Sequence, residues 1–239
     1  MGAYDALKAL HLLLVIVWLG TDIGTFASFN RLLDTSLSVP TRLSMSRLSE
    51  LLDQGPRSAL VLLLMLGLSL SHMGDWGFGG DAGAVLAWVA GAIGIAWFAG
   101  VWMQFWVAHA PAGEERPRWA MRFVATFKTV DLWWRVGVAA ALVLAAITSL
   151  ASDGDRGIIG ADWLAWKVLL FAGIVADGVV IRLLLPELGT TIVGIATGGS
   201  TPERELELAR QAVPLKVCVV VIWTLLVAMS ALAVIKPGG

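Results

Sequence analysis

Cysteine and charge are scarce in this sequence. Cys218 is the only cysteine among 239 residues, which excludes a disulfide framework within the chain and any zinc or iron–sulfur site built on several cysteines. Charged residues make up 15% of the chain and hydrophobic residues 58%, a composition far from that of a soluble domain. The formal net charge of -1 gives no reason to expect a nucleic-acid partner.

Long apolar runs dominate instead. Six of them approach the roughly 20 residues that cross a hydrocarbon core of about 30 Å, and they cover residues 7–29, 58–73, 83–108, 132–151, 161–185 and 213–235. The connectors are too short for a second domain. We therefore predict an all-α polytopic membrane protein whose single domain, residues 1–239, is a six-transmembrane-helix bundle. No cationic segment or cleavage site precedes the first run, which we expect to be retained as an uncleaved signal anchor.

Two connectors have helical patterns of their own. In residues 41–53, TRLSMSRLSELLD, leucines recur at helical spacing among Arg and Ser, as is typical of a helix lying in the membrane interface. In residues 200–212, STPERELELARQA, Thr201 is a candidate N-cap and Pro202 occupies the first helical position. We expect a short interfacial helix at each place.

Lysine and arginine are divided unequally between the two sides of the predicted bundle. Of the 17 such residues, thirteen lie on the side reached after the first, third and fifth runs, and four lie on the other side: Lys8, Arg156, Lys167 and Lys236. The positive-inside rule makes the richer side cytoplasmic. For a bacterial chain, both termini are then periplasmic, the protein belongs to the inner membrane, and the lipid bilayer is its first partner.

Ionisable residues inside the apolar runs are the candidate functional groups, because a charge in the membrane is costly and faces the interior or a partner. His11, Trp18 and Asp22 are separated by seven and four residues, so they lie along one helix face. His72 ends the second run on the same side as His11, and Lys167 begins the fifth from that side. His11 and His72 therefore share a leaflet and are candidate metal ligands, with Trp18 and Lys167 as candidate cofactor-binding residues.

Asp22 and Asp177 lie at similar depths in the other half of the predicted bundle. One interpretation pairs them with Arg135 or Arg182 in a buried polar network that holds the bundle together. The alternative is a path for protons. On a helix, His11 and Asp22 are ~16 Å apart, so we predict that they serve different sites.

Two stretches resemble a known family. HLLLVIVWLGTDIGTF (11–26) and WLAWKVLLFAGIVADGVVIRLLLPEL (163–188) are similar to the CopD-like superfamily of bacterial membrane proteins, named after a copper-resistance protein. The first stretch is also distantly similar to HemJ, the haem-containing membrane protoporphyrinogen oxidase. The resemblance implies a bundle of six or more helices with copper handling or a b-type haem on the periplasmic side.

Three functions follow as alternatives. Haem b needs one or two axial imidazoles and a cation for its propionates, so His11, His72 and Lys167 would make an electron-transfer or redox protein. No Cys-x-x-Cys-His motif is present, so such a haem would be noncovalent. A copper-binding permease would use soft sulfur ligands, and only Met65 and Met73 lie near these histidines. A non-catalytic subunit of a larger complex, packed against other membrane or periplasmic redox subunits or forming an oligomer, would need neither.

Overall fold

The computed structural model describes residues 2–77, 80–109, 116–152 and 158–237. Its helices are α1 (Ala3–Leu32), α2 (Val39–Leu52), α3 (Gln54–Met73), α4 (Gly80–Ala108), α5 (Arg118–Leu150), α6 (Asp162–Gly198) and α7 (Pro202–Ile235). Extended pairing in the described ranges is limited to one isolated bridge between Gly77 and Ile159. Because α2 and α3 form one apolar segment, six segments of the described ranges are long and apolar enough to cross a membrane. The predicted all-α six-helix bundle is therefore confirmed.

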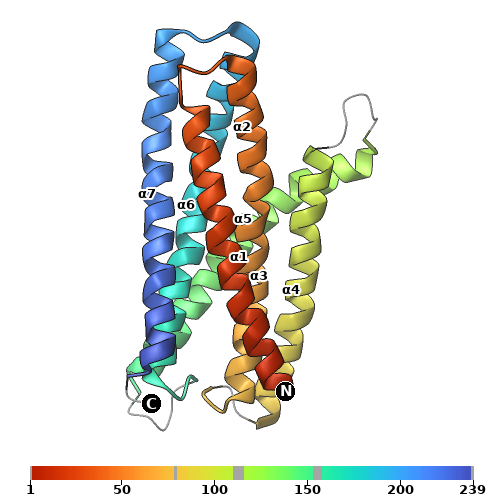
Figure 1. Ribbon diagram of the computed structural model, residues 1–239. Coiled ribbons are helices and arrows are strands. Elements are labelled where there is room, and N and C mark those ends of the chain that lie inside the picture. The colour runs from red at the N-terminus through yellow and green to blue at the C-terminus, as the bar shows by residue number, and fades with distance from the viewer. Residues whose placement is uncertain (1, 78–79, 110–115, 153–157, 238–239) are drawn as a thin grey trace.

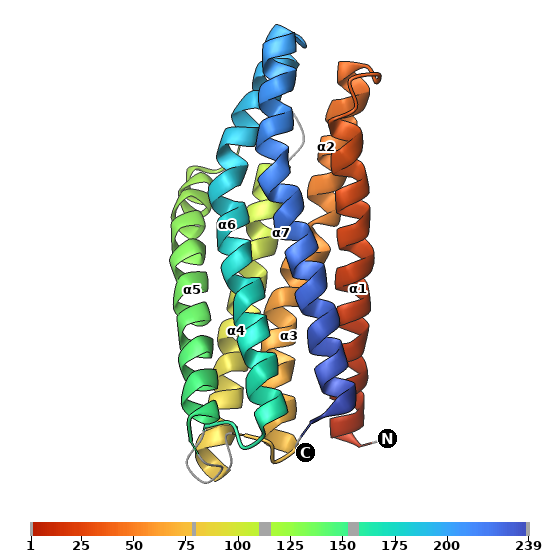
Figure 2. The same cartoon turned by 90° about the vertical axis from the view of Figure 1, so that its left-hand side faces the viewer.

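Both chain ends lie at the same end of the bundle (Figure 1). We call this the terminal end, and the end that carries the α1–α2 and α6–α7 connections the distal end. α6 packs along α5 and α7, and α1 packs along α2 and α3, whereas contact between α1 and α7 is sparse. At the distal end, the α1–α2 pair and the α6–α7 pair extend beyond α4 and α5 (Figure 2). The bundle therefore consists of two helix groups, one formed by α1, α2, α3 and α4 and the other by α5, α6 and α7.

The helix expected at residues 41–53 forms as α2, but it does not lie across the interface. Only Asp53 separates α2 from α3, and α2 stands upright beside α1 (Figure 1). The physical reason is Arg42, which is 3% exposed. Its guanidinium donates to both carboxylate oxygens of Glu205 at 2.7 Å and to the Leu32 carbonyl at 2.7 Å, so α2 is tied to α1 and α7.

The second expected interfacial helix is the beginning of α7. The Thr201 hydroxyl accepts the Arg204 N–H at 3.4 Å, Pro202 is the first helical residue, and Glu203 and Glu205 lie in the first turn. The predicted capping is thus confirmed. The helix does not stop at residue 212, however, but continues through Pro214 to Ile235.

Two apolar clusters hold the helices together. The larger joins α1, α3, α4, α6 and α7 and includes Trp18, Val61, Trp97 and Ile174, and the smaller lies nearer the distal end around Leu208. Many large apolar side chains elsewhere point outward, as a bilayer-facing surface requires. The conspicuous ones are Leu12, Ile16, Val85, Trp88, Trp106, Trp133, Leu144 and Val227.

A close approach between α1 and α3 fixes the level at which their polar residues meet. A Cβ atom at Gly55 would overlap the Thr21 side chain, so only glycine allows these backbones to come so near. Asp22 follows Thr21 on α1, and Gln54 precedes Gly55 on α3. Both side chains line the same interior space. Both are buried.

Candidate functional site

A buried ion cluster joins α4, α5 and α6. The Asp131 carboxylate is 1% exposed and accepts the Trp97 indole N–H at 2.5 Å. Arg135, one turn later on α5, donates through Nε at 3.1 Å, and Arg182 of α6 lies with its Nη2 atom at 2.8 Å. The Arg135 guanidinium also lies 5.1 Å from the centre of the Trp97 ring. One carboxylate therefore serves two guanidiniums and an indole in the middle of the bundle.

The predicted polar network exists, but with a different acid at its centre. Arg135 and Arg182 meet at Asp131, a residue that our sequence analysis did not single out. Asp22 instead accepts the Trp223 indole N–H at 2.7 Å. Asp177 lies beside the Cys218 thiol, and its Oδ2 atom is buried without a hydrogen-bond partner. The expected pairing of Asp22 or Asp177 with these arginines is not formed in the described part of the chain.

A large cavity lies between the helices in the distal half. Its volume is about 440 Å³, and all seven helices contribute to its wall. On α1 it is lined from Trp18 to Leu32, a length of ~21 Å along the helix. Trp18 and Arg135 lie at its inner end, whereas Glu50 and His109 lie at its outer end. We call this space the distal cavity.

Three buried polar atoms on the wall of the distal cavity have no hydrogen-bond partner in the described structure. They are Trp18 Nε1 on α1, Gln54 Oε1 on α3 and Arg135 Nη2 on α5. The three residues are only 2–3% exposed. Buried polar groups are normally paired because leaving them unpaired costs about 1–3 kcal/mol each, and more when they are charged. The three residues line the same cavity from three different helices, which makes these atoms the candidate binding groups of the distal cavity.

The acidic residues of the distal cavity, unlike these three atoms, have partners. Asp53 pairs with Arg57 one turn later, at the start of α3. The Glu50 carboxylate of α2 lies 2.9 Å from the Nε2 atom of His109, the residue directly after α4, so the two side chains bridge the outer end of the cavity. His109 also stacks on Phe105, with the ring centres 4.1 Å apart.

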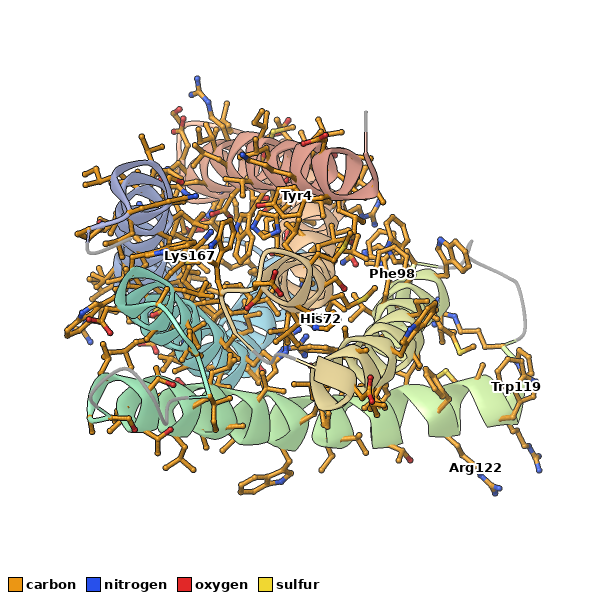
Figure 3. The ribbon with its side chains drawn as sticks, turned by 90° about the horizontal axis from the view of Figure 1, so that it is seen from below. Tyr4, His72, Phe98, Trp119, Arg122 and Lys167 are labelled. Carbon is orange, nitrogen blue, oxygen red and sulfur yellow. The ribbon has the colours of Figure 1, made fainter. Side chains whose placement is uncertain are left out.

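The His11 side chain lies on the other side of Trp18, toward the terminal end. Its Nδ1 atom is buried without a hydrogen-bond partner. Its Cε1 atom faces Gly67 of α3, where an added Cβ would lie 3.8 Å away. Lys167 interacts electrostatically with the imidazole, and Figure 3, viewed from the terminal end, shows Lys167 pointing into the bundle while Arg122 points outward.

The predicted cofactor residues are thus divided between two places. His11 and Lys167 lie together, and His72 occupies the last turn of α3, near the same end. Trp18, seven residues after His11, lines the distal cavity with Asp22, Arg135 and Arg182. Within the described ranges, no group of three or more His, Cys, Asp or Glu side chains is placed to hold a metal ion.

The chain is a multi-pass membrane protein, as its six long apolar segments indicate. No model of a known protein family matches it, and neither does any curated protein or solved structure. The resemblance to the CopD-like superfamily therefore stays a prediction.

Proposed function

We propose that this membrane protein binds a small amphipathic molecule in the distal cavity. The observation that carries the proposal is that three residues with buried, unpaired polar atoms line one cavity: Trp18 with Nε1, Gln54 with Oε1 and Arg135 with Nη2. A ligand that presents polar atoms to these groups would supply the missing hydrogen bonds.

The walls of the distal cavity favour a ligand with a substantial apolar part. Side chains such as Phe26, Leu185 and Ile222 line it from α1, α6 and α7. Its volume of about 440 Å³ lies within the range of about 300–1,000 Å³ that is usual for small-molecule sites, which also combine apolar walls with a few placed polar groups.

Mass spectrometry of molecules extracted from the purified protein tests this function. The informative variant is Gly178→Leu, because a Cβ at Gly178 would lie 3.8 Å from Arg135 Nη1 and a leucine would fill the space beside the guanidinium. Gly137→Leu is the matched control, since Gly137 faces open space on α5. We expect one amphipathic species to accompany the wild type and the control in near-equal amount and to be lost from Gly178→Leu. Equal retention in all three proteins, or no bound species in any, would contradict the proposal.

We also propose an orientation in which the distal cavity lies on the cytoplasmic side of a bacterial inner membrane and both termini are periplasmic. The support is the excess of lysine and arginine on the distal side. A periplasm-dependent reporter should be active when fused at the C-terminus and inactive when inserted between α4 and α5. The reverse pattern would invert the orientation.

A second candidate function is haem b binding for electron transfer, favoured by the buried, unpaired His11 Nδ1 atom beside Lys167. In this proposal His11 holds the iron, alone or with His72, and Lys167 meets a propionate, consistent with the CopD-like and HemJ-like resemblance. A bound haem would supply the one-electron chemistry. Copper at the same imidazole would instead indicate a permease.

The absorption spectrum of the purified protein distinguishes these possibilities. A Soret band that shifts on reduction and disappears in His11→Ala, but survives in His109→Ala at the distal end, would support haem. Copper that is retained by the wild type and lost in His11→Ala would support the permease. A colourless, copper-free protein isolated with partner chains would favour the subunit alternative and remove both cofactors.

A further inference from the structure

We infer that the polar group of the ligand in the distal cavity is an anion, most simply the carboxylate of a molecule with a long apolar body. The inference rests on the proposed function, because it concerns the occupant of the same cavity. It depends on the balance of charge around Arg135 and on the end of the cavity at which the unpaired donors lie.

We call the buried group of Asp131, Arg135, Arg182 and Trp97 the Asp131 cluster. It carries more positive than negative charge. Both guanidiniums meet a single carboxylate, whose oxygens already accept from Trp97, Arg135 and Arg182. Arginine stays protonated in proteins. One positive charge of the cluster is therefore uncompensated, and the Nη2 atom of Arg135 is the part of it that remains without a partner.

No acid on the cavity wall forms an ion pair with this cluster. Asp53 is paired with Arg57, Glu50 lies against His109, and Asp22 accepts the Trp223 indole. Five Lys and Arg residues line the cavity against three Asp and Glu residues, so counting Asp131 behind the wall still leaves an excess of positive charge. Lys128 and Lys216 are among the five, and neither is in an ion pair in the described structure. An anionic guest has the complementary charge.

The unpaired donors place the anion at the inner end of the distal cavity. Trp18 is the first residue of α1 to line the cavity, counted from the terminal end, and Arg135 is the last residue of α5 to do so. Trp18 Nε1 and Arg135 Nη2 both donate, and a guanidinium N–H matches a carboxylate oxygen in geometry as well as charge. Toward the outer end, the wall continues past Phe26 and Phe29. From Trp18 to Phe29 this wall extends ~16 Å along α1, which suits an elongated apolar body.

The same chemistry has two sources, an acyl carboxylate from the membrane and a compact aromatic carboxylate from the aqueous side. Three probes separate them when titrated into the full chain in nanodiscs of zwitterionic phosphatidylcholine: laurate, dodecanol and 1-naphthoate. Dodecanol has the apolar body of laurate without its charge. We expect laurate to bind at least about tenfold more tightly than dodecanol. Preference for laurate over naphthoate assigns the membrane source, and the opposite preference assigns the aqueous one.

Substitution of the guanidinium identifies the group responsible. In Arg135→Gln the difference between laurate and dodecanol should fall below about twofold, whereas Arg31→Gln, an exposed arginine outside the cavity, should leave it unchanged. Should Arg135→Gln fail to fold, Gly178→Leu should weaken laurate in the same way with all charges intact. The comparison of laurate with dodecanol in the wild type tests the inference even if neither variant folds.

The outcomes separate the two proposals. If dodecanol binds the wild type as tightly as laurate and Gly178→Leu weakens both, the distal cavity binds amphipathic molecules but the anion inference is wrong. If Gly178→Leu prefers laurate over dodecanol as strongly as the wild type does, the anion binds elsewhere and the inference also fails. If no probe binds and no molecule accompanies the purified protein, the proposed function itself is overturned.

Discussion

The two ends of the bundle differ in how their polar and aromatic groups are used. At the terminal end, the Gly160 N–H donates to the Trp76 carbonyl at 2.8 Å, and Trp76 and Trp163 pack edge to face with ring centres 5.3 Å apart. The Lys236 ammonium lies 4.4 Å and 5.3 Å from the centres of these two rings. At the distal end the helices separate around the distal cavity, whose inner polar atoms are unpaired.

The fold is therefore closed at the terminal end and leaves a cavity in the distal half. Chain segments that are distant in sequence seal the terminal end, because Tyr4, Trp76, Trp163 and Lys236 all gather there. In the distal half, charged contacts join the helices: Arg42 ties α2 to α7, and Asp131 with Arg182 ties α5 to α6. Substitutions at these places should therefore have effects of different size on stability. The four predictions below run from the largest expected effect to the smallest.

The largest effect is expected at the inner wall of the distal cavity. Asp131→Asn leaves two guanidiniums in the bundle without a counter-charge, so the free energy of unfolding should fall by about 3–5 kcal/mol. Thermal unfolding in detergent measures this change. Asp34→Asn, at an acid of the α1–α2 connection that also meets an arginine, is the control and should leave the unfolding free energy nearly unchanged. Similar losses in both variants would mean that the Asp131 cluster does not hold the bundle.

A smaller effect is expected at the contact between Arg42 and Glu205, near the distal end. Arg42→Gln removes the paired contact with Glu205 and the bond to the Leu32 carbonyl, and we expect a loss of about 2–3 kcal/mol. Hydrogen exchange should increase in α2 and remain unchanged at the terminal end. Arg47→Gln, on the exposed side of the same helix, should have no such effect. Uniform exchange throughout the bundle would contradict the separation into two ends.

The lysine at the terminal end should contribute less. Lys236→Met keeps an apolar side chain against Trp76 and Trp163 but removes the charge, and the expected loss is about 0.5–1 kcal/mol because cation–π contacts at partly exposed sites have this size. The control is Lys8→Met, an exposed lysine near the same end. Tryptophan fluorescence should report the local change. An effect as large as that of Asp131→Asn would show that the terminal end, not the inner wall, dominates stability.

The smallest effect is expected at the distal end, outside the distal cavity. In the α1–α2 connection, hydrogen bonds from the Ser36 hydroxyl and the Ser36 backbone N–H hold the pKa of Asp34 below its usual value. A carboxyl with a lowered folded-state pKa stabilises the fold above its unfolded pKa, and this stabilisation is lost as the pH falls through the folded-state pKa. The loss should therefore begin below about pH 4. Acid titrations of the wild type and Ser36→Ala detect it, and we expect the wild type to lose more stability below that pH than Ser36→Ala does. A larger loss in Ser36→Ala would contradict the prediction.

The fold was more predictable from the sequence than the candidate site was. Apolar runs mark the six crossing segments because lipid demands continuous apolar helix, and local chemistry marks the Thr201 cap because its hydrogen bond closes within one turn. The upright position of α2 depends on Arg42 and Glu205, which are 163 residues apart in the chain. No local pattern contains that contact.

The identity of the central acid could not be read from helical periodicity alone. Asp131 and Arg135 form an acid–arginine pair one helical turn apart, and this spacing is the signal of the cluster that the sequence contains. Arg182 meets Asp131 because α5 and α6 pack with these two residues facing each other, whereas Asp22 lies on α1 and Asp177 lies on α6 itself. The distal cavity arises from the separation of whole helices, and no single residue type predicts it.

The arrangement of the Asp131 cluster also bears on how the chain is made. Asp131 and Arg135 belong to one helix, so α5 enters the bilayer with its opposite charges already paired along one face. α6 brings Arg182, whose counter-charge was synthesised earlier in α5. The order of synthesis therefore matches the order of charge neutralisation, and α5 and α6 are suited to partition from the translocon into lipid as a pair. A rearranged chain in which α6 emerged before α5 would expose Arg182 to the bilayer without its acid.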